Sequence, residues 1–134
     1  MEIYCGTDII EIERIEKAIK EYENNEKNIF LNKIYTENEI KYCESKGRMK
    51  YQHYAARFAA KEAIFKAISN LLKDKYEVSW KNAEITNDKN GRPQVIFRNI
   101  SKELQNKIKN IDISLSHTKE LAIAVVVLPY LTTP

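Results

Sequence analysis

The sequence predicts an α+β domain in which a mainly antiparallel sheet has one long helix packed on it. β-Prone runs occur in pairs that are joined by short turn-forming segments, which is typical of antiparallel hairpins. The longest helical pattern covers residues 51–72 and stands between such runs. A length of 134 residues, with 43% hydrophobic and 31% charged side chains, is typical of a soluble globular protein. We therefore expect a single domain over residues 1–134.

The first half of the chain is expected to form one strand and three helices. Residues 2–9 alternate and are rich in β-forming side chains, which predicts a strand. Isoleucines at helical spacing predict a helix over 12–22, and the polar run "NNEKN" at 24–28 ends it. A further helix over 36–45 begins with "TENE", a capping-box pattern. The long helix over 51–72 follows.

The second half is expected to complete the sheet. The segment "AEITNDKNGRPQVIF" at 83–97 predicts a hairpin, because "NDKNG" forms turns and its glycine can take a positive φ. A short amphipathic helix is predicted over 100–109. "IDISLS" at 111–116 and "LAIAVVVL" at 121–128 are further strands, the second expected to be buried, and the tail 129–134 is expected to be loose. The predicted order is β-α-α-α-β-β-α-β-β.

Composition narrows the class of protein. The net charge is only +3, from 22 basic and 19 acidic residues, so the chain permits an anionic partner without requiring one. Cys5 and Cys43 form no metal-type cluster and are expected to be reduced thiols of a cytoplasmic protein. The N-terminus lacks the pattern of a signal peptide, and the longest apolar run is too short to span a membrane. We expect no membrane contact.

The segment "RFAAKEA" at 57–63 places a carboxylate on the apolar side of the long helix. Glu62 shares a helical face with Phe58 and Phe65. A carboxylate in such surroundings must be paired, protonated or bound to a metal ion. Two interpretations stay open from this helix alone: an ion pair with Lys66, one turn further on, or a functional site.

A second carboxylate, Asp8, stands where the first strand gives way to the first helix. It could cap that helix, with Glu11 three residues later completing a capping box. Asp8 together with Glu62 could instead hold Mg²⁺, which needs only one or two carboxylates beside water and substrate phosphates. Two carboxylates without a histidine or cysteine cluster suit Mg²⁺ better than zinc.

Two turns carry further polar groups. In "SLSHTKELAIA", His117 and Thr118 stand at a corner between two strands, where they form either an ordinary turn or, with Lys119, a set of donors for a phosphate. In "NGRPQV", the hairpin turn displays Arg92 at its tip.

Four stretches together resemble the holo-acyl-carrier-protein synthases, the small members of the 4'-phosphopantetheinyl transferase superfamily. They are "GTDIIEIERI", "RFAAKEAIFKA", "NGRP" and "ISLSHTKELAIA", and they extend over residues 6–124. The resemblance implies the fold of that superfamily. It also implies Mg²⁺-dependent transfer of phosphopantetheine from coenzyme A to a serine of apo acyl carrier protein, with release of adenosine 3',5'-bisphosphate. This reaction serves fatty acid biosynthesis.

The resemblance also implies roles for particular residues. Asp8 and Glu62 would hold the metal ion, Lys61 would contact a phosphate and assist catalysis, and Arg14 would meet the acidic carrier protein. The serine proton would go to Glu62, directly or through water, or to a carboxylate of the carrier. The residues that would bind coenzyme A are Arg57, Lys61, Gly91, Arg92, Pro93, His117 and Thr118.

The short members of this family assemble as trimers, which implies a homotrimer with active sites at subunit interfaces. The alternative from another class is a small, basic nucleic-acid-binding domain without enzymatic activity. The near balance of charge argues against it, as does the lack of aromatic residues interleaved with Lys and Arg on a strand. A different Mg²⁺-dependent phosphoryl transferase is disfavoured because no Walker-type glycine loop is present. No nucleic-acid partner is expected.

Overall fold

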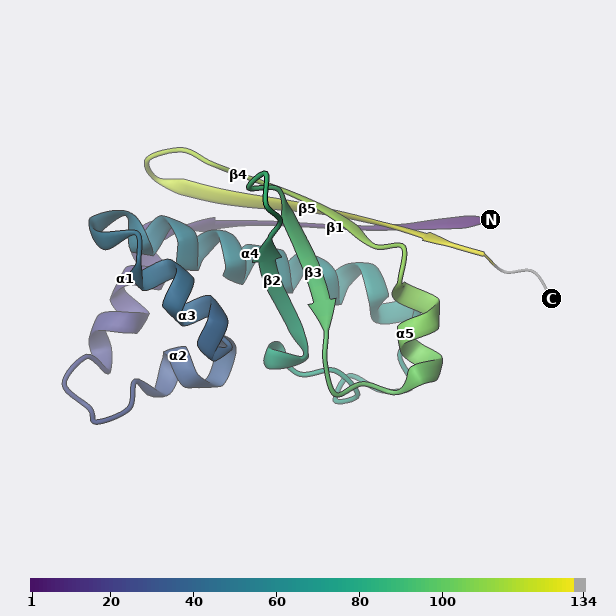
Figure 1. Cartoon of the computed structure of the whole chain (residues 1–134), viewed down its shortest axis with the longest axis horizontal. Coiled ribbons are helices and arrows are strands. Elements are labelled where there is room, and N and C mark those ends of the chain that lie inside the picture. The colour runs from purple at the N-terminus through teal and green to yellow at the C-terminus, as the bar shows by residue number, and fades with distance from the viewer. Residues whose placement is uncertain (132–134) are drawn as a thin grey trace.

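The computed structural model describes residues 1–131 and consists of a sheet layer and a helical layer (Figure 1). The order of elements is β1 (Glu2–Glu11), α1 (Ile12–Glu21), α2 (Ile29–Ile34), α3 (Glu37–Glu44), α4 (Lys50–Ile68), β2 (Ala83–Asn87), β3 (Pro93–Phe97), α5 (Lys102–Ile108), β4 (Asp112–His117) and β5 (Leu121–Tyr130). Short 3-10 turns occupy Gly47–Met49, Ser69–Leu71 and Trp80–Asn82. The predicted α+β class with antiparallel pairing is confirmed.

The main sheet has the strand order β1-β5-β4, with both pairings antiparallel. The central strand is therefore β5, while β1 and β4 form the two edges. Asp8 on β1 lies opposite Ala124 of β5, and His117 on β4 lies opposite Ala122. The hairpin β2–β3 forms a separate two-stranded sheet that crosses in front of α4 in Figure 1.

Helix α4 packs along one face of the main sheet, and small side chains allow the close approach. The alanines of α4 that are buried against neighbouring elements are Ala55, Ala56, Ala59, Ala60, Ala63 and Ala67. On β1, a Cβ at Gly6 would overlap the carbonyl oxygen of Ala63. Gly6 therefore lets the β1 backbone lie directly on α4, two residues before Asp8.

Three local predictions were wrong: one missed a helix, so the observed order has four helices before β2 instead of three, and two misplaced the end of an element. Residues 29–34, expected to be a connection, form α2, because the Asn28 side chain caps it by accepting from the Leu31 N–H. Helix α4 ends at Ile68 and continues as a 3-10 turn, where the Ser69 hydroxyl donates to the Lys66 carbonyl. Strand β5 runs on to Tyr130, so Pro129 and Tyr130, expected to be loose, belong to a strand, and residues 132–134 of the expected loose tail lie outside the described residues.

Two local predictions are confirmed. The capping box at the start of α3 is present, with the Thr36 hydroxyl accepting from the Glu39 N–H and the Glu39 carboxylate accepting from the Thr36 N–H. Gly91 in the hairpin turn has a φ of 83°. Cys5 and Cys43 are free thiols, as expected.

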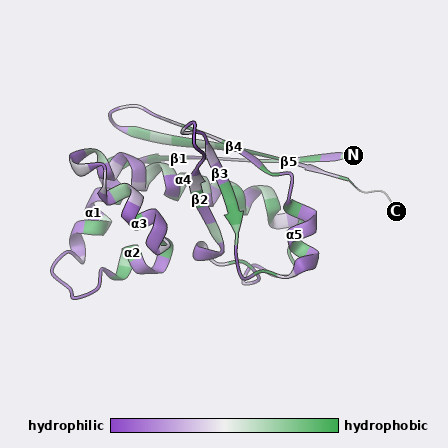
Figure 2. Ribbon diagram, viewed as in Figure 1, coloured by the Kyte–Doolittle hydropathy of each residue, from purple (hydrophilic) through white to green (hydrophobic). Residues whose placement is uncertain are grey.

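Strand β5 is apolar on both faces, but only one face is covered. Ala122, Ala124, Val126 and Leu128 are fully buried on the side of α4. The alternate residues Leu121, Ile123, Val125 and Val127 are 36–43% exposed. Figure 2 shows hydrophobic colouring along this sheet. The expectation of a buried strand thus holds for one face, and the other, with Ile9 of β1 at 60% exposure, is an uncovered apolar surface.

Candidate functional site

Asp8 and Glu62 meet a lysine at the contact between β1 and α4. The Asp8 side chain is 19% exposed, and its Oδ1 lies 3.3 Å from Lys66 Nζ. The same ammonium donates to the Thr7 carbonyl oxygen at 2.9 Å. Glu62 stands one turn before Lys66 on α4 and is partly buried beside them. Gly6 makes this arrangement possible, because it brings β1 onto the helix.

The charges of this group do not balance. Burial raises the pKa of Glu62, the negative charge of Asp8 raises it further, and Lys66 opposes both effects. One ammonium thus faces two carboxylates, which leaves an excess negative charge at a partly open position. Such a place attracts a further cation.

Both structural alternatives from the sequence are wrong here. The N-cap of α1 is Glu11 rather than Asp8, and the Glu11 side chain makes no capping hydrogen bond. Within residues 1–131, Lys66 forms its ion pair with Asp8, and no pair of Lys66 with Glu62 lies within bonding distance.

The donor set fits a hard divalent cation. Over residues 1–131, no group of three or more His, Cys, Asp or Glu side chains converges as a cage would. Mg²⁺ does not need one, because it keeps several waters and takes one or two carboxylates together with substrate phosphates. Asp8 and Glu62 are the residues that would hold it.

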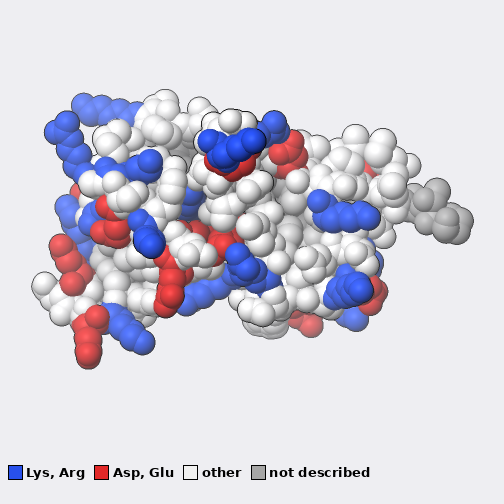
Figure 3. Space-filling model, viewed as in Figure 1, with Lys and Arg blue, Asp and Glu red and all other residues white. Residues whose placement is uncertain are grey.

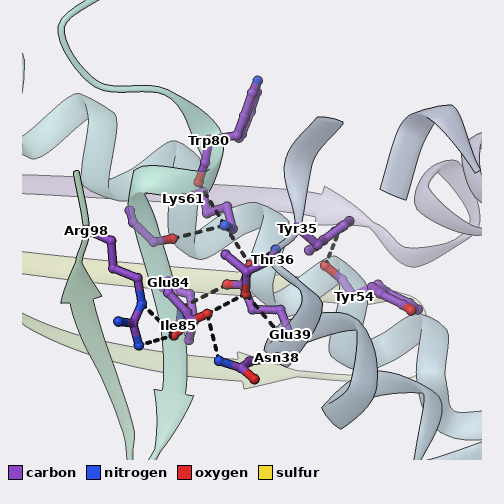
Figure 4. Close-up of polar contacts among 11 residues, drawn as sticks. Tyr35, Thr36, Asn38, Glu39, Tyr54, Lys61, Trp80, Glu84, Ile85 and Arg98 are labelled. Atoms are coloured by element: carbon purple, nitrogen blue, oxygen red, sulfur yellow. Dashed lines mark hydrogen bonds and ion pairs between the residues drawn. The ribbon is translucent and has the colours of Figure 1, made fainter. Parts of the chain in front are cut away.

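Lys61, although adjacent to Glu62 in sequence, does not reach this group. Its side chain is fully buried, and its ammonium lies 2.8 Å from Glu39 Oε1 on α3 (Figure 4). It also donates to the carbonyl oxygens of Trp80 and Ala83. The expected contact of Lys61 with a phosphate would require this amine to leave all three acceptors.

Arg57 lines a separate hollow of about 520 Å³ between α3, α4 and the hairpin. The residue is 3% exposed, its Nη2 donates to Asn87 Oδ1 at 2.8 Å, and its guanidinium lies 4.1 Å from the Tyr42 ring centre. Arg57 Nε and Thr86 Oγ1 are buried here and have no hydrogen-bond partner among residues 1–131. Lys46 also lines this hollow. The hollow is therefore cationic, and it contains polar groups that are free to bind a ligand.

The corner after β4 has the predicted turn. The Thr118 hydroxyl accepts from the N–H groups of Glu120 and Leu121, which leaves its own proton free to donate. His117 is exposed, and its ring lies 6.3 Å from that of His53 on α4. Because His53 stands one turn before Arg57, the corner lies on the Arg57 side of the helix.

The structure divides the "NGRP" motif between two places. Gly91 lines the Arg57 hollow. Arg92 instead pairs with Asp112 at the start of β4, at 3.0 Å, and both side chains are exposed. Pro93 begins β3 and lines a smaller hollow with Arg92. Arg14 is exposed on α1.

The two groups of residues face different sides of α4. At 100° per residue, Arg57 and Glu62 point about 140° apart, and five residues separate them by about 7.5 Å along the axis. Asp8 and Glu62 lie at the β1 edge of the sheet, whereas Arg57 and His117 lie toward the β4 edge. The single chain therefore does not bring these two groups into one pocket.

Sequence reasoning considered Lys66 only as a partner for Glu62 and did not identify Tyr42 or Asn87. The helical spacing from Glu62 was a usable signal for Lys66. Tyr42 and Asn87 reach Arg57 from α3 and β2, and no local pattern indicates such contacts.

The chain is similar in sequence and structure to known proteins. The profile of the 4'-phosphopantetheinyl transferase superfamily matches residues 4–126. A holo-[acyl-carrier-protein] synthase from a Thermoanaerobacter species is 43% identical over 126 residues, covering 92% of this chain and 85% of that protein. The crystal structure of a Bacillus anthracis holo-(acyl-carrier-protein) synthase in complex with CoA (3',5'-ADP) has a TM-score of 0.73 at 36% identity, covering 93% of this chain and 94% of that one. The Helicobacter pylori enzyme in complex with coenzyme A has a TM-score of 0.74 at 32% identity, covering 93% and 99%.

Proposed function

The chain belongs to the 4'-phosphopantetheinyl transferase superfamily, and we propose that it acts over residues 1–134 as a single holo-acyl-carrier-protein synthase domain. It transfers the phosphopantetheine arm of coenzyme A to a serine of apo acyl carrier protein, in support of fatty acid biosynthesis. The observation that carries this proposal is the meeting of Asp8, Glu62 and Lys66 where β1 lies on α4.

The reaction needs charge stabilisation and positioning. The serine oxygen bonds to the β-phosphorus of coenzyme A, the bond from that phosphorus to the bridging oxygen breaks, and adenosine 3',5'-bisphosphate leaves. Asp8 and Glu62 would hold Mg²⁺, and this ion would supply charge neutralisation at the phosphoryl oxygens when bound. Lys66 Nζ, already at this place, adds a positive charge toward the same oxygens. The serine proton would go to Glu62, directly or through a metal-bound water, or to a carboxylate of the carrier protein.

The nucleotide end of coenzyme A fits the second group of residues. The Arg57 hollow offers a guanidinium with an unpartnered Nε, and Gly91 admits a close approach because nothing lies within 4 Å of where its Cβ would be. We assign His117 and Thr118 to the same end of the ligand, since the corner lies on this side of α4. Arg92 and Pro93 would border it from the hairpin tip, once Arg92 exchanges Asp112 for a phosphate.

A homotrimer would join the two groups between subunits. Edge β1 carries Asp8 and edge β4 ends at His117, so a head-to-tail ring would place one edge beside the other edge of the neighbour. The active site would then take Asp8, Glu62 and Lys66 from one subunit and Arg57 and the corner from the next. The uncovered apolar face of β5 supports such an assembly, because contiguous exposed apolar surface marks a contact.

The carrier protein would dock on α1, where Arg14 is exposed to meet its acidic surface. No helix among the described residues combines the length and apolar character needed to cross a membrane. We place the enzyme in the cytoplasm, where its reduced thiols and its substrates would be found. On the face seen in Figure 3, Lys and Arg are interspersed with Asp and Glu, which gives no support to the nucleic-acid-binding alternative.

A mass measurement tests the proposed function. The chain is incubated with apo acyl carrier protein, coenzyme A and Mg²⁺, with a parallel sample containing EDTA, and the carrier is weighed. A carrier heavier by one phosphopantetheine only in the sample with metal supports the proposal. An unchanged carrier contradicts it, provided that the chain is folded and that the carrier is accepted by another transferase.

A further inference from the structure

The ammonium of Lys61 has no hydrogen-bonding capacity left for a substrate. Its three protons have three acceptors, which are Glu39 Oε1 at 2.8 Å, the Trp80 carbonyl oxygen at 2.8 Å and the Ala83 carbonyl oxygen at 2.9 Å. The side chain is fully buried. A group so enclosed and saturated acts on other parts of the protein rather than on a ligand.

Glu39 joins three elements around this ammonium. Its Oε1 accepts from the Thr36 N–H at the start of α3 as well as from Lys61 on α4. Its Oε2 accepts from the Ile85 N–H in the middle of β2, at 2.8 Å. Every partner of the Glu39 carboxylate is a donor, so an amide in its place would turn its NH₂ group toward another donor.

The hairpin β2–β3 is thus attached to α4 at two levels. At the start of β2, Lys61 binds the carbonyl oxygens of Trp80 and Ala83. At its end, Asn87 accepts from Arg57. Ile85 and Thr86, which line the Arg57 hollow from β2, lie between these attachments, so the position of this part of its wall depends on both.

The same attachment governs the direction of Glu62. Lys61 and Glu62 are consecutive on α4, and their side chains leave the helix about 100° apart. A fixed Lys61 therefore resists rotation of the helix about its axis, and that rotation would move Glu62 away from Asp8. The Trp80 ring, stacked on Phe58 with ring centres 5.2 Å apart, packs against the same stretch of helix.

We propose that the Lys61–Glu39 pair is a positioning device for the transfer reaction, with Lys61 acting through Glu39 and the hairpin and not by contact with a phosphate. This inference rests on the proposed function. It assigns a role to Glu39, which lies outside both groups of site residues, and it replaces the contact with substrate that the sequence suggested for Lys61.

The test compares Lys61→Met and Glu39→Gln with two controls, Lys73→Met and Glu37→Gln, whose side chains are exposed. Rates are measured over a range of coenzyme A concentrations at a temperature where circular dichroism shows each variant folded. Both site variants are expected to lose about 10–100-fold in kcat/KM, mainly through a higher KM for coenzyme A. Because Trp80 is the only tryptophan, its fluorescence is also expected to shift in both variants and in neither control.

Three results would overturn the inference. A loss of kcat at unchanged KM in Lys61→Met, with wild-type kinetics in Glu39→Gln, would mean that Lys61 contacts the phosphate. Wild-type kinetics in both folded variants would mean that the pair only stabilises the fold. A shift of tryptophan fluorescence in the controls as well would remove the link to the hairpin. Failure of the proposed function itself would appear separately, as absence of transfer by the wild-type chain.

A double variant covers the case in which the single variants do not fold. Lys61→Met with Glu39→Met removes both charges and keeps similar volume, so it avoids an unpaired buried charge. It leaves the Ile85 N–H and the two carbonyl oxygens without their partners, and its KM for coenzyme A is therefore expected to stay raised. A folded double variant with wild-type KM would refute the positioning role.

Discussion

Lys61 and Glu62 are neighbours on α4, yet their charged groups lie in opposite kinds of surroundings. The Lys61 ammonium is fully buried and uses all its protons on three acceptors. The Glu62 carboxylate is partly open, faces the like charge of Asp8 and has a raised pKa. A saturated group holds the structure in place, whereas an unsaturated one is free to bind and react. Residue type alone does not separate the two.

Arg57 resembles Glu62 rather than Lys61, because its charged group is not saturated by hydrogen bonds. It is as buried as many core residues, but its Nε has no partner and it borders a hollow. Its hydrogen bond to Asn87 orients the guanidinium without saturating it. Burial therefore does not mark a structural role, and the number of unused donors and acceptors is the better criterion.

The largest effect on stability is expected at the saturated Lys61–Glu39 pair. Lys61→Met leaves the Glu39 carboxylate buried without its countercharge, which should lower the free energy of unfolding by about 3–5 kcal/mol. Chemical denaturation checks this value, with Lys73→Met as the exposed control. A loss under about 1 kcal/mol, the size typical of an exposed ion pair, would mean that the pair is not sealed from water.

At Glu62 and Asp8 we expect a large loss of transfer activity and little loss of stability. Glu62→Gln and Asp8→Asn should each reduce transfer by about 10²–10³-fold, or roughly 3–4 kcal/mol in activation free energy, because charge stabilisation at the phosphoryl oxygens is lost. The fold should remain, since neither carboxylate is saturated. The exposed Glu13→Gln is the matched control for transfer rates. Retention of most activity by Glu62→Gln would place Glu62 with the structural residues.

Gly6 separates the two groups experimentally, because it sets the contact of β1 with α4 at Asp8 and Glu62 and does not touch the Lys61–Glu39 pair. Gly6→Ala places a Cβ against the α4 backbone at Ala63, where no flexible side chain can move aside. We expect about 1–3 kcal/mol of destabilisation and loss of transfer, as β1 carries Asp8 away from Glu62. Trp80 fluorescence should stay unchanged, because the hairpin is not displaced. Cys5→Ser, at an exposed neighbouring position, is the control.

The sequence predicted the elements better than the roles. Periodicity and the capping box indicate α3 and α4 because these signals are local, whereas α2 has only 6 residues and depends on the cap at Asn28. The residues alone left the Asp8–Glu62 metal site as one of two interpretations, and the resemblance favoured it. The role of Lys61 could not be read, since its acceptors come from α3 and from the start of β2, and no local pattern indicates such distant pairing.

The smallest effect is expected in the pH dependence of stability. Burial and Asp8 raise the pKa of Glu62 in the folded state above its value in the unfolded chain. Between these two pKa values the folded state binds more protons, so wild-type stability falls as the pH rises through this window and levels off above the folded pKa.

Glu62→Gln lacks this titration. The difference in the free energy of unfolding between the variant and wild type should therefore be close to zero below the ordinary pKa of a glutamate. It should rise in favour of the variant over the same pH window. Thermal melts of both proteins at acidic and neutral pH measure the difference, again with Glu13→Gln as the control. Added Mg²⁺ should stabilise the wild-type chain more than the variant, because the cation needs both carboxylates. A variant that melts below wild type at neutral pH would show that Glu62 is already compensated by Lys66, and the contrast with Lys61 would then no longer hold.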